Sequence, residues 1–141
     1  AAMVPLPGEL LGDWWANTDW AQVRNDAAER NGTTPVGMDD PVALYLHDLP
    51  PDVKAESVHH ERDQSGTPMG ERWPLPAWPD VPTRVVLCRE DRFFPPDFQR
   101  RMAEERLGMS ADEMDGGHMA ALSRPKEMAE VLERLRVAAA V

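Results

Sequence analysis

The sequence predicts an α/β fold in which the last strands and helices of a parallel sheet lie under a helical region. The first observation is the order of patterns in the C-terminal part: a short apolar run, a helix, a weaker strand and a second helix, at 84–88, 96–107, 109–114 and 124–136. Strands and helices that alternate in this way are typical of parallel strands joined by right-handed crossovers. The second observation is the different texture of residues 9–80, where short helical patterns alternate with proline-rich joints.

Length and charge limit the classes of protein and of partner. The chain has 141 residues, enough for one domain, and a formal net charge of −10. Nucleic acids and anionic membranes both require a basic face, so neither is expected as a partner. The single Cys88 excludes an internal disulfide and favours the cytoplasm, and we find neither a signal peptide nor an apolar run long enough to span a bilayer.

Residues 1–8 predict the end of a core strand followed by a turn. The run Ala1–Val4 is apolar, stops at Pro5 and is followed by the turn pair Pro7-Gly8. The interpretation is a buried strand whose beginning is missing. The alternative is a processed N-terminus with no structural meaning.

Residues 9–80 predict a helical lid over the rest of the fold. Asp19 is expected to cap a first helix that Gly32 ends, and Asp40 to cap a second helix that begins with Pro41. The three expected helices cover residues 19–31, 40–46 and 50–63. Residues 68–82, with five prolines, predict a loop.

Residues 81–141 predict a C-terminal core unit that does not complete a sheet alone. The apolar run 84–88 suits a buried parallel strand, which requires a neighbour on each side. Gly108 is expected to end the helix that Pro96 begins, and Ser123 to cap the last helix. We therefore expect another polypeptide to complete the ordered form, either a missing N-terminal portion or a second copy of the chain.

Asp91 and His118 are the candidate catalytic residues. Asp91 follows the strand at 84–88, and His118 lies in a loop after Gly116-Gly117. Side chains at the carboxyl ends of parallel strands gather at one edge of the sheet. An aspartate that accepts a hydrogen bond from histidine Nδ1–H fixes the tautomer and stabilises the imidazolium formed during proton transfer. On spacing alone, a loop histidine and a turn-capping aspartate remain the alternative.

Four segments extend this pattern to a known family; they are residues 1–8, 81–91, 95–102 and 115–127. With them the sequence resembles α/β-hydrolases of the plant methylesterase and hydroxynitrile lyase group and their bacterial relatives, closely over 81–141, more loosely over 1–20 and weakly between. The resemblance implies that Asp91 is the acid and His118 the base of a catalytic triad, that residues 9–80 form the lid, and that no metal or organic cofactor takes part.

The sequence lacks the nucleophile that this family requires. A G-x-S-x-G elbow presents the serine on a strained turn beside an oxyanion hole. None of the serines has that context; they are Ser57, Ser65, Ser110 and Ser123. We therefore expect a portion of a carboxylesterase that has no esterase activity alone and acts on a small ester when complete. Non-catalytic association and binding of a small ligand without turnover are the alternatives.

Met119 and several aromatic residues are candidates for the substrate pocket. In the lyases a lysine follows the catalytic histidine and stabilises departing cyanide, whereas a thioether cannot, so Met119 favours ester hydrolysis within the resemblance. Trp14, Trp15 and Phe94 are further candidates for an apolar pocket. Each aromatic side chain can equally be a packing anchor.

Two other candidate sites have simpler explanations. Cys88 is expected to be a packed core thiol, because no cation or helix N-terminus is placed to lower its pKa. His59 and His60 are adjacent on a predicted helix, so they point in different directions and are expected on a solvated face instead of at a metal.

Overall fold

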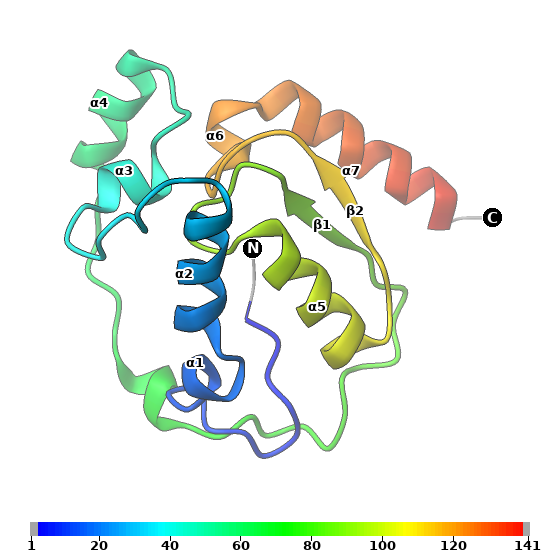
Figure 1. Ribbon diagram of the computed structural model, residues 1–141. Coiled ribbons are helices and arrows are strands. Elements are labelled where there is room, and N and C mark those ends of the chain that lie inside the picture. The colour runs from blue at the N-terminus through cyan, green and yellow to red at the C-terminus, as the bar shows by residue number, and fades with distance from the viewer. Residues whose placement is uncertain (1–2, 140–141) are drawn as a thin grey trace.

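A two-stranded parallel sheet lies between two helices in the computed structural model, which describes residues 3–139. Strand β1 (Val85–Cys88) pairs with β2 (Ala111–Met114) in parallel, with Val85 opposite Ala111 and Cys88 opposite Met114. Helices α5 (Pro96–Leu107) and α7 (Pro125–Ala139) flank the sheet (Figure 1). The predicted parallel pairing with a helical crossover is confirmed for this unit.

Local sequence explains why this unit forms. Proline at the first position of α5 has the φ of a helix and has no N–H to leave unpaired, while Gly108, at φ 66°, ends the helix in the left-handed region. Phe98 and Met102 of α5 are buried in one core cluster. A second cluster joins α7 to the strands through the apolar side chains Cys88, Met114, Val131 and Leu135.

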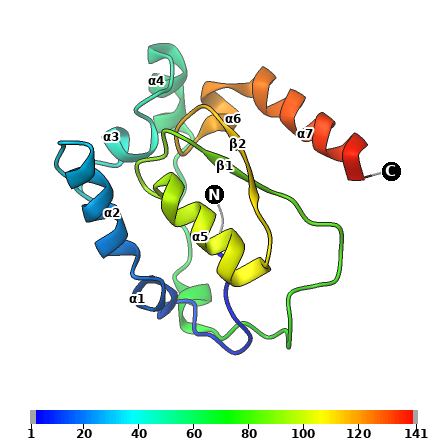
Figure 2. The same cartoon turned by 45° about the vertical axis from the view of Figure 1, so that its right-hand side comes forward.

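Four short helices lie to one side of the sheet (Figure 2). They are α1 (Trp14–Asn17), α2 (Trp20–Arg30), α3 (Pro41–Tyr45) and α4 (Pro51–His59), and they are followed by the 3₁₀ turn η1 (Thr67–Gly70). Trp14 ties this region to α5, because its ring has no exposed surface and lies edge-on to Phe94 and Phe98. The Trp20 indole N–H donates to the Phe93 carbonyl at 2.8 Å.

Several sequence-based expectations for helix ends are confirmed. Asp40 caps α3 by accepting a 2.9 Å hydrogen bond from the Ala43 N–H. The helix expected over 19–31 is α2, and Gly32 follows it with φ 64°. The third helix ends at His59, four residues before the expected end at Asp63.

Three expectations about local structure are wrong. Asp19 does not cap α2, because its backbone is left-handed at φ 51° and its side chain makes no capping hydrogen bond. Ser123 is the last residue of the short helix α6 (Ala120–Ser123) and not the cap of α7. Met3 and Val4 are not in a strand; the Val4 carbonyl instead accepts from the Trp14 indole N–H. The first two residues of that expected strand end lie outside the described residues.

The helices that the structure describes include none that is both long enough and apolar enough to cross a membrane.

Candidate active site

Asp91 is a buried carboxylate held by the turn that follows β1. Its side chain is 1% exposed. Oδ1 accepts backbone N–H bonds from Phe93 at 2.8 Å and Phe94 at 2.9 Å. Oδ2 faces the Gln99 amide at 3.5 Å. A buried carboxylate with this many donors is fixed in one orientation.

His118 lies opposite the second oxygen of that carboxylate. Its Nδ1 is 3.0 Å from Asp91 Oδ2, so the predicted hydrogen bond is present. The preceding Gly116 has φ 120°, a conformation that residues with a Cβ rarely adopt, and this turn brings the loop after β2 back to the sheet edge. The His118 side chain is 18% exposed, so a reacting group can approach it.

Three aromatic rings hold the His118 imidazole from the sides. The ring centroids of Tyr45, Phe93 and Phe94 lie 5.1, 5.2 and 5.7 Å from that of the imidazole. With Nδ1 facing Asp91, the carboxylate accepts from Nδ1–H and leaves the lone pair on Nε2. Within residues 3–139, no group is hydrogen-bonded to Nε2. The arrangement can therefore accept a proton at Nε2 and return it.

Asp48, a residue that sequence reasoning missed, holds the loop on which His118 lies. Its Oδ2 accepts the Gly117 backbone N–H at 2.7 Å. A Cβ at Gly117 would come within 2.5 Å of Asp48 Oδ1 and 2.8 Å of His47 Nε2, so any other residue there would force these two side chains to move. His47 Nε2 in turn lies 3.0 Å from the Glu90 carbonyl, next to Asp91. Through Asp48 and His47, the segment after α3 therefore contacts both the loop of His118 and the residue that precedes Asp91.

The pKa of Asp48 is lowered overall in the fold. Burial alone raises it, but the Ser123 hydroxyl, the Gly117 N–H and the charge of His47 act more strongly in the other direction. Ser123 Oγ and Asp48 Oδ1 are both buried, and neither has a hydrogen-bond partner among the described residues. No sequence pattern marks Asp48, because its partner is 69 residues away.

The residues predicted for a substrate pocket differ in their exposure and in whether they contact His118. Phe94 lies against His118, and Trp15 stacks on Phe94 with a centroid distance of 6.2 Å. Trp14 has no exposed surface, so in this conformation it packs the core and cannot touch a substrate. Met119 is 37% exposed next to the candidate base.

Among the described residues, no serine or cysteine side chain is hydrogen-bonded to the His118 imidazole. Cys88 is buried in the core cluster of α7, and burial raises the pKa of its thiol, which keeps it protonated. Ser57 Oγ donates to the Lys54 carbonyl, and Ser65 pairs with Thr67. His60 pairs with Glu56 on an exposed face of α4, and over residues 3–139 no cluster of potential metal ligands occurs.

An acid after one parallel strand that is hydrogen-bonded to a histidine after the next is the arrangement of the acid and base in α/β-hydrolases. Comparison with known families agrees with the geometry. The model of the alpha/beta hydrolase family matches residues 1–131, nearly the whole chain, and the chain belongs to that family. The small parallel sheet with its helices is consistent with part of an α/β-hydrolase fold. No curated protein and no solved structure gave a match.

Proposed function

We propose that this chain supplies the acid and the base of an ester-cleaving active site. The observation that carries the proposal is the 3.0 Å contact between Asp91 Oδ2 and His118 Nδ1, made by a buried carboxylate and a partly exposed imidazole. In this role His118 takes the proton of an attacking serine and later returns it to the leaving alcohol. Asp91 fixes the tautomer of His118 and stabilises the imidazolium.

The nucleophile and the oxyanion donors come from a segment outside these 141 residues. None of the serines described above has the strained turn that exposes a nucleophile. Loss of the nucleophile and of the oxyanion donors removes both the covalent step and transition-state stabilisation. The chain alone is therefore expected to have no appreciable esterase activity.

The substrate proposed is a small ester, as in the plant methylesterase group, with residues 9–80 as the lid. Met119 supports ester hydrolysis over cyanohydrin cleavage, because a thioether carries no charge to stabilise departing cyanide. Phe93 and Phe94 are buried beside His118 and make the surroundings of the imidazole apolar. The aromatic side chains of the lid pack on the same two residues.

A fluorophosphonate label tests this function, because it reacts only with an activated serine. The tagged chain is recovered from cells that express it naturally and is then labelled. The label is expected on a co-purifying polypeptide, and His118→Ala should abolish it. His59→Ala, an exposed change on α4, is the matched control and should leave it intact. Labelling of this chain itself, or labelling that survives His118→Ala, would overturn the assignment.

Association is the second proposal, and the free side of β1 supports it. Over residues 3–139, β1 pairs with β2 only. An apolar groove of about 270 Å³ lies beside β1, lined by Val85, Val86, Phe98 and Met102 among others. Unpaired strand edges next to apolar surface are sites of strand addition. Sedimentation decides the matter: a cooperatively melting monomer of 15.8 kDa would contradict the proposal.

A further inference from the structure

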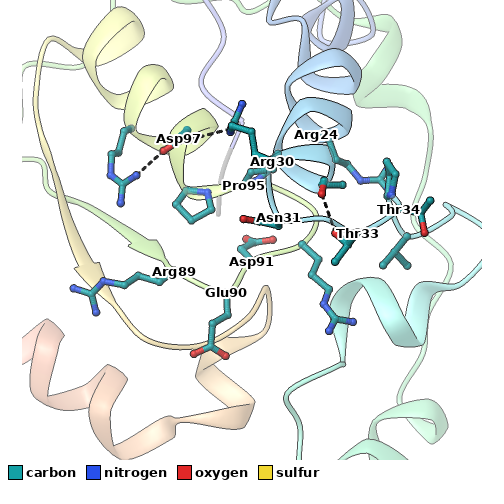
Figure 3. Close-up of a pocket in the computed structure, with 17 residues that line it drawn as sticks. Arg24, Arg30, Asn31, Thr33, Thr34, Arg89, Glu90, Asp91, Pro95 and Asp97 are labelled. Carbon is teal, nitrogen blue, oxygen red and sulfur yellow. Dashed lines mark hydrogen bonds and ion pairs between the residues drawn. The ribbon is translucent and has the colours of Figure 1, made fainter.

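A cavity of about 680 Å³ lies between α2, the segment 31–36 and the turn after β1 (Figure 3). Its lining is rich in arginine, although the chain as a whole has a net charge of −10. The arginines that line it are Arg24, Arg30, Arg89, Arg92 and Arg100. The lining also holds the carboxylates of Glu90, Asp91 and Asp97, so arginines outnumber acids there, and this excess of positive charge in an acidic protein favours an anion.

Most of these arginines already have a partner. Arg30 pairs with Asp97 at 3.1 Å, and Arg100 bridges Asp97 and Glu113. Arg89 pairs with Glu113 and Asp115. Arg92 donates to the Ala43 carbonyl at 3.0 Å. Carboxylates therefore neutralise three of these arginines and a backbone carbonyl binds the fourth, whereas Arg24 has no such partner in the described part of the chain.

Arg24 is buried, and two of its nitrogens have no partner. The residue is 8% exposed, and both Nε and Nη2 are buried without a hydrogen bond to any described residue. Figure 3 shows its side chain leaving α2 towards the segment that carries Thr33 and Thr34. Burial lowers the pKa of the guanidinium. The Trp20 ring, whose centroid lies 5.3 Å from Cζ, offers the positive charge a cation–π contact. A buried cation without a hydrogen-bonded anion is unfavourable, so this one lacks a counter-charge.

The identity of the free nitrogens indicates the shape of the missing partner. Nε–H and one N–H of Nη2 lie along a single edge of the planar guanidinium, and that edge binds the two oxygens of a carboxylate side by side. Because Glu90, Asp91 and Asp97 also line the cavity, a singly charged carboxylate suits it better than a doubly charged phosphate. Alanine, proline and valine side chains in the lining can accept a hydrocarbon body; they are Ala27, Ala28, Pro35 and Val36.

We propose that this cavity binds a small organic carboxylate through Arg24. The site does not depend on the proposed esterase function, since it needs neither a nucleophile nor proton transfer. It lies close to the catalytic pair, because Asp91 is part of its lining and Tyr45, which touches His118, interacts with the charge of Arg24. A bound carboxylate would therefore lie beside the acid–base pair.

Titration calorimetry of benzoate into the full 141-residue chain tests the proposal. Benzoate is expected to bind with one-to-one stoichiometry, and Arg24→Gln should weaken binding at least roughly tenfold by removing the charge-assisted bonds. Arg24→Lys keeps the charge but loses the paired donors, so it should bind in between. Arg30→Gln changes a half-exposed arginine of the same cavity that Asp97 already holds, and should leave benzoate affinity within about twofold.

Further ligands and a folding check complete the test. Benzamide has the same shape without charge and should not bind, and inorganic phosphate should bind more weakly than benzoate. The proposal fails if benzamide binds as well as benzoate, if phosphate binds more tightly, or if Arg24→Gln binds benzoate normally. If Arg24→Gln does not give a folded circular dichroism spectrum, Arg24→Lys decides: unchanged benzoate affinity in that variant overturns the proposal.

Discussion

The turn around Asp91 and the face of α2 around Arg24 line the same cavity, and each buries one charge. The Asp91 carboxylate has donors on both oxygens, two backbone N–H groups on Oδ1 and the side chains of Gln99 and His118 on Oδ2. The Arg24 guanidinium leaves two nitrogens without an acceptor among the described residues. A buried charge whose hydrogen bonds the fold completes is structural or orients another group, whereas one with two unpaired donors calls for a further partner, which we propose is a ligand.

A second buried arginine shows that this fold can satisfy a guanidinium. Arg106 pairs with Glu9 at 2.6 Å, and their side chains are 7% and 6% exposed. Glu9 also accepts from Asn17 and from the Leu6 N–H. Burial by itself therefore does not explain the missing acceptors at Arg24. Because Arg106 has a carboxylate partner and Arg24 has none among the described residues, substitutions of the two should change the free energy of unfolding differently. The proposed carboxylate site can therefore be tested by unfolding as well as by binding.

The largest effect is expected at Asp91. Asp91→Ala leaves the N–H groups of Phe93 and Phe94 and the Nδ1–H of His118 buried without an acceptor, so the free energy of unfolding should fall by about 4 kcal/mol. Asp91→Asn retains one acceptor oxygen and should lose about half as much. Urea denaturation measures both changes.

The control for Asp91 is the same change at an exposed carboxylate. Asp80→Asn lies in an exposed loop segment and should change the free energy of unfolding by less than about 0.5 kcal/mol. If Asp91→Asn is no worse than this control, the turn does not depend on its carboxylate and the account of the site is wrong.

The two buried arginines should respond differently to the same substitution. Arg106→Met leaves Glu9 as an uncompensated buried charge and should lower the free energy of unfolding by about 3 kcal/mol. Arg24→Met removes an uncompensated charge but also the contact with Trp20, so in ligand-free buffer it should stay within about 1 kcal/mol of the wild type. Equal losses in urea denaturation would show that Arg24 is already satisfied.

A smaller, pH-dependent effect is expected at Asp48. Its pKa is lowered in the folded protein, so the carboxylate stabilises the fold above its unfolded pKa of about 3.9, and that contribution disappears as pH falls through the lowered folded pKa. Asp48→Asn should therefore lose about 1 kcal/mol at pH 7 and less at pH 3.5. A difference from wild type that does not change with pH would contradict this, as would the same behaviour in the exposed variant Asp52→Asn.

Sequence patterns predicted the parts of the fold that local physics determines. The proline that begins α5, the glycine at φ 66° that ends it and the alternation of strand and helix all act over a few residues. Asp91 and His118 were found because each follows a strand of one parallel sheet. Asp48 and Arg24 have no such pattern, because contacts distant in the sequence define the role of each. The cap expected at Asp19 failed because its backbone is left-handed, which propensity alone does not reveal.

The most direct test of the central claim is the tautomer of His118, measured by long-range ¹H–¹⁵N NMR correlation on the ring nitrogens. Asp91 Oδ2 at 3.0 Å from Nδ1 predicts that the neutral form of the imidazole carries its proton on Nδ1 and its lone pair on Nε2. Asp91→Asn, whose amide can donate to the ring, should shift the population towards the Nε2–H form. A wild-type imidazole with its proton on Nε2, unaffected by Asp91→Asn, would contradict the claim that Asp91 orients His118 as a base.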